Sequence, residues 1–340
     1  MRILVTGGTG YIGSHTVVEL HDAGYEIVIA DDLSNSNIEV LNNIEKIIGI
    51  KPLFFKVDLS DVVQTDKFFN ETKNIDAIIH FAASKSVGES VEKPLLYYKN
   101  NINSLLNVLI NMEKHGIKNL VFSSSCTVYG QPDILPVVET TPRKPAESPY
   151  GNTKTIAEDI IRDVCKVTPK TNAIALRYFN PIGAHPSALI GELPNGIPSN
   201  LIPYITQTAA GIRECLSVFG DDYNTPDGTA IRDFINVVDL AQAHVVAIDR
   251  LINLKQESNF EFFNIGTGEG YSVMQLIKAF IKATGINLNY KIVPRRAGDI
   301  EKIWADTTIS SKKLGWKTKI SLEESLLSSW NWEKKFRGLK

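Results

Sequence analysis

Short aliphatic runs alternate with helical patterns through the first half of this 340-residue chain. The runs, bounded by turn residues, predict strands at residues 2–6, 26–30, 53–57, 75–81 and 120–123. Between the first two runs, Ile12, Val17 and Leu20 recur at helical spacing. Strands that alternate with helices in this way predict an α/β fold, a Rossmann-type doubly wound parallel sheet.

The alternation thins after residue 178, where Pro, Gly and Asn become more frequent over residues 180–203. This composition is typical of ligand-binding loops. We therefore expect a dinucleotide-binding Rossmann domain over residues 1–178 and a smaller mixed α/β, mainly substrate-binding domain over residues 179–340. The chain is expected to cross between the two domains, so the boundary is approximate.

Two predicted helices, over residues 94–114 and 149–166, are apolar on more than one side. In the first helix, Leu106 and Ile110 extend the main apolar stripe to a second face, and in the second helix Ile161 lies beside the stripe. Helices of this kind are buried on more than one side. We expect a homodimer with a two-fold interface through these helices. The alternative is that a C-terminal segment covers them.

Composition narrows the class of protein. Hydrophobic residues make up 43% of the chain and charged residues 22%, as in soluble globular proteins, and the net charge of -2 favours neither nucleic acid nor anionic membranes. We expect no membrane span and no signal peptide. The cysteines, Cys126, Cys165 and Cys215, are odd in number and far apart, which favours the reducing cytoplasm. The six histidines are not clustered, so no metal site is expected.

A glycine-rich turn separates the first predicted strand from the first predicted helix. Gly7, Gly10 and Gly13 would allow a tight turn and let a pyrophosphate approach the helix N-terminus. Asp31, at the end of the second strand, lies near the expected spacing of about 20 residues and could bind the adenosine ribose hydroxyls. No arginine follows Asp31 to hold a 2′-phosphate. The pattern predicts NAD rather than NADP as cofactor, the alternative being an ordinary glycine-rich turn.

Small and polar residues follow the later predicted strands. Asp58 ends the third strand, residues 80–83 follow the fourth, and residues 124–127 follow the fifth. The carboxyl ends of parallel strands meet at one edge of a sheet, where open α/β sheets bind ligands. We interpret His80 as a packed residue at a strand end rather than as a catalyst.

Tyr150 and Lys154 are four residues apart, so they share one face of a helix that Ser148 and Pro149 would begin. A free phenol, with a pKa of about 10, is a poor base at neutral pH. A nearby ammonium group lowers this pKa, so the pair could form a tuned acid/base. The alternative is a surface Tyr and Lys that merely share a face.

Ser125, at the end of the fifth strand, together with Tyr150 and Lys154, resembles the catalytic arrangement of extended short-chain dehydrogenases/reductases. Within that family, nearly the whole chain is similar to the UDP-glucose 4-epimerases. The similarity rests on the segments VTGGTGYIGSHT, FAASKSVGESVEKPLLYY, FSSSCTVYG, SPYGNTK, LRYFNPIGAHPS, GIPSNLIPYI, DGTAIRDFINVVDLA and PRRAGDIEKIWAD. The segments after residue 178 are much more specific than the glycine and YxxxK motifs.

The resemblance implies a hydride cycle on a UDP-hexose substrate, with NAD as cofactor and no net redox change. Tyr150 would exchange a proton with the sugar 4-hydroxyl, and Ser125 would hydrogen-bond the same oxygen. Lys154 would bind the nicotinamide ribose and, with the cationic ring, lower the Tyr150 pKa. The transient 4-keto sugar would turn over and take the hydride back on its other face, which inverts C4. A homodimer is also implied.

The resemblance places site residues position by position. Contacts to NAD would come from Gly7, Gly10, Tyr11, Ile12, Gly13, Asp31, Asp32, Leu33, Ser34, Asn35, Ser36, Asp58, Leu59, Phe81, Ala82, Ala83, Ser84, Lys85, Asn100, Tyr150, Lys154 and Phe179. Contacts to the UDP-sugar would come from Ser125, Tyr150, Asn180, Asn200, Leu201, Ser217, Val218, Phe219, Arg232, Arg296, Asp299 and Ile303. Two arginines suit a diphosphate, because each offers a bidentate fork.

The sequence departs from the family pattern at Cys126, where Ala is usual, and at Ile303. The resemblance implies that a bulky residue at position 303 restricts the enzyme to plain hexoses and that a small residue also admits N-acetyl sugars. A UDP-N-acetylhexosamine 4-epimerase is therefore one alternative. A nucleotide-sugar 4,6-dehydratase is less favoured, because its Asp-Glu pair is missing after Ser125. A catalytically inactive NAD-binding sensor would have lost Tyr150 or Lys154.

A second glycine cluster, over residues 266–270, has the spacing GxGxG rather than GxGxxG. Ser272 and Gln275 follow it as a capping box. We interpret the cluster as a tight turn into a structural helix, not as a second dinucleotide site. Ser321 and Glu324 form another capping box, which is expected to open the last helix.

Overall fold

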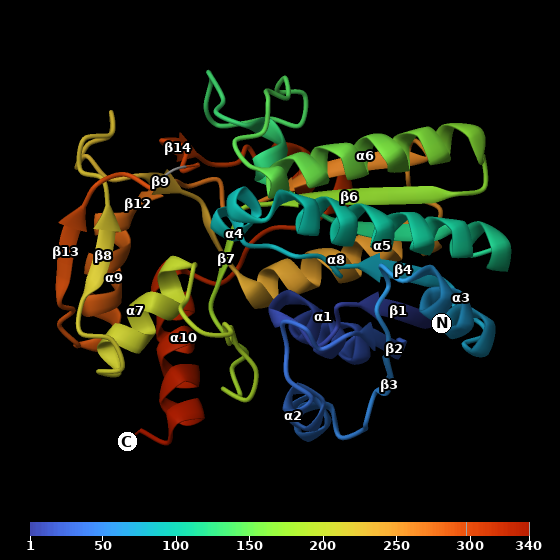
Figure 1. Ribbon diagram of the computed structural model, residues 1–340, viewed down its shortest axis with the longest axis horizontal. Helices are drawn as coiled ribbons and strands as arrows, with labels where there is room; N and C mark the ends of the chain where they lie inside the picture. The colour runs from blue at the N-terminus through green and yellow to red at the C-terminus, as the bar shows by residue number, and fades with distance from the viewer. Residues whose placement is uncertain (297, 340) are drawn as a thin grey trace.

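The computed structural model describes residues 1–296 and 298–339, which contain a seven-stranded parallel sheet (Figure 1). In chain order its strands are β1 (Arg2–Thr6), β2 (Glu26–Asp31), β3 (Leu53–Lys56), β4 (Ala77–His80), β5 (Asn119–Ser125), β6 (Asn172–Tyr178) and β11 (Phe260–Ile265). Their spatial order is β11-β6-β5-β4-β1-β2-β3. The order reverses between β1 and β4, which is where open α/β sheets bind ligands. The predicted Rossmann-type fold is confirmed.

Helices cover both faces of this sheet. One face carries α1 (Tyr11–Asp22), α2 (Glu39–Ile48) and α8 (Val237–Ile252), and the other carries α3 (Val62–Glu71), α5 (Pro94–His115) and α6 (Pro149–Val167). Successive side chains of β1 point alternately to the two helix layers. Ile3 and Val5 pack with the first set of helices, whereas Leu4 packs with the second.

Most strands of this sheet were predicted from the sequence. The five strands predicted in the first half are present, with ends that differ by at most two residues. Sequence reasoning did not single out β6 or α8. Residues after 178 contribute α8 and β11 to the layers of the large sheet, so the chain crosses back. The domain boundary near residue 178 itself stays a prediction.

A smaller group of elements lies on one side of the large sheet (Figure 1). It contains α7 (Leu201–Ala209), α9 (Val273–Thr284), α10 (Leu322–Arg337) and β8 (Leu216–Phe219), which share one apolar core, and β13 (Tyr290–Val293), which pairs with β8. Short strands link the two parts: β7 (Asn180–Ile182), β9 (Ile231–Arg232), β10 (Phe234–Asn236), β12 (Tyr271–Ser272) and β14 (Lys302–Ile303). The remaining elements are α4 (Val87–Glu92) and two single turns, Cys126–Tyr129 and Ser310–Leu314.

Both predicted capping boxes are confirmed, at Ser272 before α9 and at Ser321 before α10. The glycine cluster before α9 packs on Asp233, whose carboxylate accepts bonds from the Thr267 and Gly268 backbone N–H groups. The cluster is therefore a turn into a structural helix, as predicted, and the buried Asp233 carboxylate that holds it was not predicted.

Two faces of α5 are apolar, as predicted. Leu105 and Leu109 are buried in the core, whereas Leu106 and Ile110 are exposed. Leu95, in the first turn of α5, is 82% exposed. Within residues 1–296 and 298–339, no helix combines the length and the apolarity needed to cross a membrane.

Candidate active site

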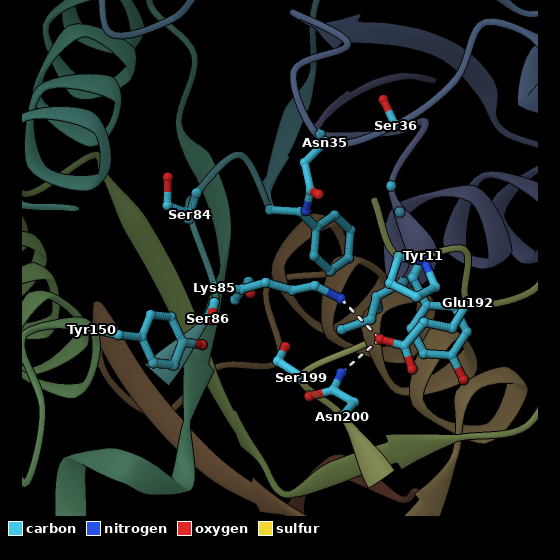
Figure 2. A pocket seen from close by; sticks show the side chains of 18 of the residues that line it. Tyr11, Asn35, Ser36, Ser84, Lys85, Ser86, Tyr150, Glu192, Ser199 and Asn200 are labelled. Carbon is cyan, nitrogen blue, oxygen red and sulfur yellow. Dashed lines mark hydrogen bonds and ion pairs between the residues drawn. The ribbon is translucent and has the colours of Figure 1, made fainter. Parts of the chain in front are cut away.

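A cavity of about 1370 Å³ opens at the carboxyl edge of the large sheet. Its walls come from both parts of the molecule, from the glycine turn after β1 to Ile303 in β14. Figure 2 shows side chains that converge on it, among them Tyr11, Lys85 and Tyr150. The cavity thus brings together residues that lie about 300 positions apart in sequence.

Most of the predicted ligand-contacting residues line this cavity. The predicted contact residues that the structure describes but that do not line the cavity are Leu33, Leu201, Ser217, Val218 and Phe219. Val218 is fully buried beside Leu216, since alternate residues of β8 face the core. Phe219 is 40% exposed, with the Arg296 guanidinium 5.4 Å from its ring centroid.

The glycine turn leaves no room for larger side chains. A Cβ atom on Gly13 would lie 2.2 Å from the Gly7 carbonyl oxygen. Gly7 has a φ of +68°, and a Cβ atom there would lie 2.9 Å from the Ala82 nitrogen. Turn, helix α1 and the segment after β4 therefore meet closely where the sheet order reverses. This cradle fits a pyrophosphate at a helix N-terminus.

Asp31 organises the loop that follows β2. Its carboxylate accepts hydrogen bonds from the backbone N–H groups of Thr9 and Leu33, at 3.1 and 2.9 Å, and from the Ser36 hydroxyl at 3.2 Å. The side chain is almost fully buried, yet Asp31 lines the cavity. A fixed carboxylate in this position suits a diol such as the ribose of a dinucleotide.

Tyr150, Ser125 and Lys154 meet at one place in the cavity wall. The Ser148 hydroxyl accepts a hydrogen bond from the Gly151 N–H at 3.2 Å, so α6 begins where the sequence indicated and presents Tyr150 in its first turn. One turn later, Lys154 Nζ donates to the Ser123 carbonyl at 2.6 Å and lies 5.8 Å from the Tyr150 ring centroid.

Burial is the main influence on the pKa values of Tyr150 and Lys154. Burial raises the pKa of Tyr150 to about 12, although a hydrogen bond with Ser125 acts in the opposite direction. Burial also lowers the pKa of Lys154 to about 7, against the raising effect of the Glu158 charge. For the protein groups alone the Tyr150 pKa is raised, because desolvation dominates and Lys154 is not among the groups that shift it. The expectation that Lys154 and the cationic ring together lower this pKa stays a prediction. A further positive charge is needed to favour the phenolate.

Lys154→Met should reveal this depressed pKa as a change in stability. Between about pH 7 and 10.5 the unfolded chain binds more protons than the folded chain, so the contribution of Lys154 to stability rises with pH. We expect the variant to raise the denaturation midpoint of cofactor-free protein at about pH 7, with a gain that shrinks toward about pH 10. Lys166→Met, exposed on the same helix, is the control. A gain that is absent or independent of pH would contradict the assignment.

Two arginines face the other end of the cavity. Arg296 forms a fork with Asp299, with Nε to Oδ2 at 3.1 Å and Nη2 to Oδ1 at 2.8 Å. Arg232 donates to the backbone carbonyls of Ile231 and Ile300, at 2.9 and 2.7 Å, and burial lowers its pKa. Among the described residues the hydrogen-bond partners of Arg232 are backbone carbonyls rather than a carboxylate, so its guanidinium can bind an anion.

His80 does not reach the reacting groups as an acid or base. It is 2% exposed, its Nδ1 lies 2.9 Å from the Thr6 hydroxyl, and burial lowers its pKa to about 3. The interpretation of His80 as a packed strand-end residue is confirmed.

Two important carboxylates were not predicted from the sequence: Glu192 in the cavity wall and Glu158 buried behind it. Glu192 lines the cavity and binds Lys85 and Asn200 (Figure 2). Glu158 is buried one turn after Lys154 and binds Arg177. Its spacing of four from Lys154 was a usable signal, because i and i+4 share a helix face. Glu192 stands in an irregular loop, where no periodicity marks it.

The fold and the Ser-Tyr-Lys trio are those of an extended short-chain dehydrogenase/reductase, and a family model described as GDP-mannose 4,6 dehydratase matches residues 4–328. UDP-glucose 4-epimerase of Dictyostelium discoideum is 51% identical over 332 residues, which cover 98% of this chain and 95% of that protein. The crystal structure of UDP-glucose 4-epimerase from Bifidobacterium longum in complex with NAD+ and UDP is 46% identical, covers 98% of each chain and has a TM-score of 0.95. The chain belongs to the UDP-glucose 4-epimerase family.

Proposed function

We propose that this protein interconverts UDP-galactose and UDP-glucose by inverting C4 of the sugar through a transient 4-keto intermediate, with NAD as its bound cofactor. The observation that carries the proposal is the meeting of Tyr150, Ser125 and Lys154 with the glycine cradle in one cavity. Near-full-length similarity to UDP-glucose 4-epimerases supports it. Incubation with UDP-galactose and product analysis for UDP-glucose tests it.

The residues present fit NAD. The cradle formed by Gly7 and Gly13 admits a pyrophosphate, and Asp31 faces the cavity where an adenosine ribose would lie. Lys154 would hold the nicotinamide ribose once it exchanges its bond to the Ser123 carbonyl. When bound, the nicotinamide ring supplies the hydride acceptor and donor and a positive charge near Tyr150.

The protein groups have separate tasks in this proposal. Tyr150 takes the proton of the sugar 4-hydroxyl during oxidation and returns it during reduction. Ser125 hydrogen-bonds the same oxygen and fixes it beside the phenol. Arg232 and Arg296 hold the diphosphate, which leaves the sugar as the part of the substrate that can turn. The acid and base are one residue, so no proton has to leave the site between the two half-reactions.

A nucleotide-sugar 4,6-dehydratase is the nearest alternative, because the matching family model carries that description. Elimination of water from C5 and C6 needs an acid and a base near C6 in addition to Tyr150. After Ser125 the chain instead supplies Cys126 and Thr127, and burial raises the pKa of the Cys126 thiol to about 12. These residues favour epimerisation.

Ile303 is proposed to set the size of the accepted sugar. It is fully buried, lines the cavity and packs with Cys126 and Phe179. We predict strong activity on the UDP-glucose and UDP-galactose pair and weak activity on UDP-N-acetylhexosamines. Ile303→Ala should shift the ratio of kcat/KM toward the N-acetyl sugars by about tenfold, since it removes several methyl and methylene groups. Ile292→Ala, at an exposed position, is the control. Comparable turnover of both substrate pairs by the unaltered protein would contradict the prediction.

We also propose a homodimer through α5 and α6. The exposed side chains of Leu106 and Ile110, together with the half-buried Ile160 and Val164, support this face as an interface. A cytoplasmic location is proposed with it, because Cys126, Cys165 and Cys215 are all free. Light scattering gives the mass of the particle in solution and tests the dimer.

A further inference from the structure

Glu192 holds two donors of the cavity wall, from segments far apart in sequence, through a single carboxylate oxygen. Its Oε1 accepts hydrogen bonds from Lys85 Nζ at 3.1 Å and from Asn200 Nδ2 at 2.6 Å (Figure 2). Lys85 lies on the segment after β4, next to the glycine cradle, and Asn200 immediately precedes α7. In the proposed function, NAD binds beside Lys85 and the UDP-sugar binds beside Asn200.

Glu192 is an acid in a cavity that would receive two diphosphates. Its side chain is 10% exposed, whereas that of Lys85 is 45% exposed, so the carboxylate is the more deeply buried partner. A carboxylate shielded from water repels a nearby phosphate more strongly than it would in solvent. Glu192 therefore does not serve as a phosphate ligand itself, although it holds two donors that suit phosphate oxygens.

Asn200 occupies the N-cap position of α7 but uses its side chain for the contact with Glu192. The backbone of Asn200 is extended, as at the N-cap of a helix, but its side chain makes no capping hydrogen bond to α7. An Asn in this position usually accepts from the second or third helical N–H group, but the third residue of α7 is Pro203, which has no N–H. Here the amide turns into the cavity and donates to Glu192. The carboxylate thus directs a hydrogen-bond donor toward the ligand space.

We propose that Glu192 is a competitor for phosphate groups: its carboxylate and the nucleotide phosphates use the same donors, Lys85 and Asn200. This inference rests on the proposed function. Ligand phosphates must displace Glu192 from these donors and must then lie near its charge. Glu192 consequently weakens nucleotide binding and speeds nucleotide exchange. A residue that merely positioned Lys85 for phosphate would have the opposite effect on affinity.

Glu192→Gln separates these two roles, because glutamine keeps the shape and the acceptor oxygen for Asn200 but lacks the charge. We expect UDP to bind the NAD-loaded variant about three- to tenfold more tightly than the unaltered protein, measured by titration calorimetry. Unchanged or weaker binding would overturn the proposal. Glu71→Gln is the matched control, since Glu71 pairs with Lys67 at 4.0 Å on α3, outside the described cavity lining. It should leave the affinity unchanged.

Two further variants test whether charge and competition are responsible. Glu192→Asp keeps the charge and should not tighten UDP binding, and an Asp variant as tight as the Gln variant would refute the account. In an Asn200→Ala background, Glu192→Gln should gain less than half of its original increase in UDP affinity, because the donor contested at the UDP-sugar place is gone. A full gain would refute competition for Asn200. Turnover of UDP-galactose by the unaltered protein tests the proposed function separately, so the two failures are distinguishable.

Discussion

Tyr150→Phe should reduce the interconversion of UDP-galactose and UDP-glucose by about 10²–10⁴-fold or more, while the protein still retains NAD. The variant removes only the phenolic oxygen, and this oxygen is the group that exchanges the proton in both half-reactions. The ring keeps its place in the first turn of α6, and the close neighbours of Gly7 are residues 81 and 82 rather than Tyr150. Turnover is measured by product analysis, and NAD content is measured on the same preparation.

The matched control is Tyr290→Phe, which removes a hydroxyl from a 40% exposed side chain on β13. Its turnover should equal that of the unaltered protein. Near-normal turnover by Tyr150→Phe would refute the assigned role of Tyr150. Loss of NAD together with turnover would instead mean that the variant damages the cofactor site, and the role of Tyr150 as acid and base would lose its support.

Glu158→Ala should lower the free energy of unfolding by about 3–5 kcal/mol. Glu158 and Arg177 are 1% and 4% exposed and form a two-pronged pair, with Nε to Oε1 at 2.8 Å and Nη2 to Oε2 at 2.6 Å. The Ser124 hydroxyl donates to the same carboxylate at 2.6 Å. Loss of Glu158 would leave the Arg177 charge buried and uncompensated. Denaturation midpoints, compared at equal NAD content, measure the effect.

Asp159→Ala is the control on the same helix, because Asp159 is 44% exposed and pairs with Arg162 and Arg143 at the surface. That change should cost less than about 1 kcal/mol. A double replacement of Glu158 and Arg177 by apolar residues should recover much of the stability, because it leaves no buried charge. A loss below about 1 kcal/mol for Glu158→Ala would contradict the importance of this pair.

The buried pair also explains how the catalytic segment is held. Glu158 lies one turn beyond Lys154 on α6, and Ser124 precedes Ser125 on β5. Arg177, on β6, in turn donates to the Tyr129 hydroxyl at 3.0 Å. A single carboxylate therefore ties the helix that carries Tyr150 to the strand that carries Ser125.

Local signals made the glycine cradle and the start of α6 predictable from sequence. Gly13 is required by a close backbone approach, and Ser148 with Pro149 marks a helix start, so both features are encoded within a few residues. The strands of the large sheet were predictable for the same reason. Val218, in contrast, was predicted to contact substrate but faces the core, because the pairing of β8 with β13 decides which of its faces is buried.

The electrostatics of the site could not be predicted from sequence. The spacing of Tyr150 and Lys154 indicated a lowered phenol pKa, yet burial raises it. Desolvation depends on every element that packs around a group, and the four-residue spacing contains none of that information. The role of Glu192 could not be predicted for a related reason. Its partners, Lys85 and Asn200, come close to it only in the folded chain.

The most direct test of the proposed C4 hydride cycle is incubation of the purified protein, without added cofactor, with UDP-galactose that carries deuterium at C4. The account predicts UDP-glucose that retains the label at C4, with no net change in the bound NAD, because the hydride returns to the carbon that gave it. Absence of UDP-glucose, or UDP-glucose that has lost the label, would contradict it.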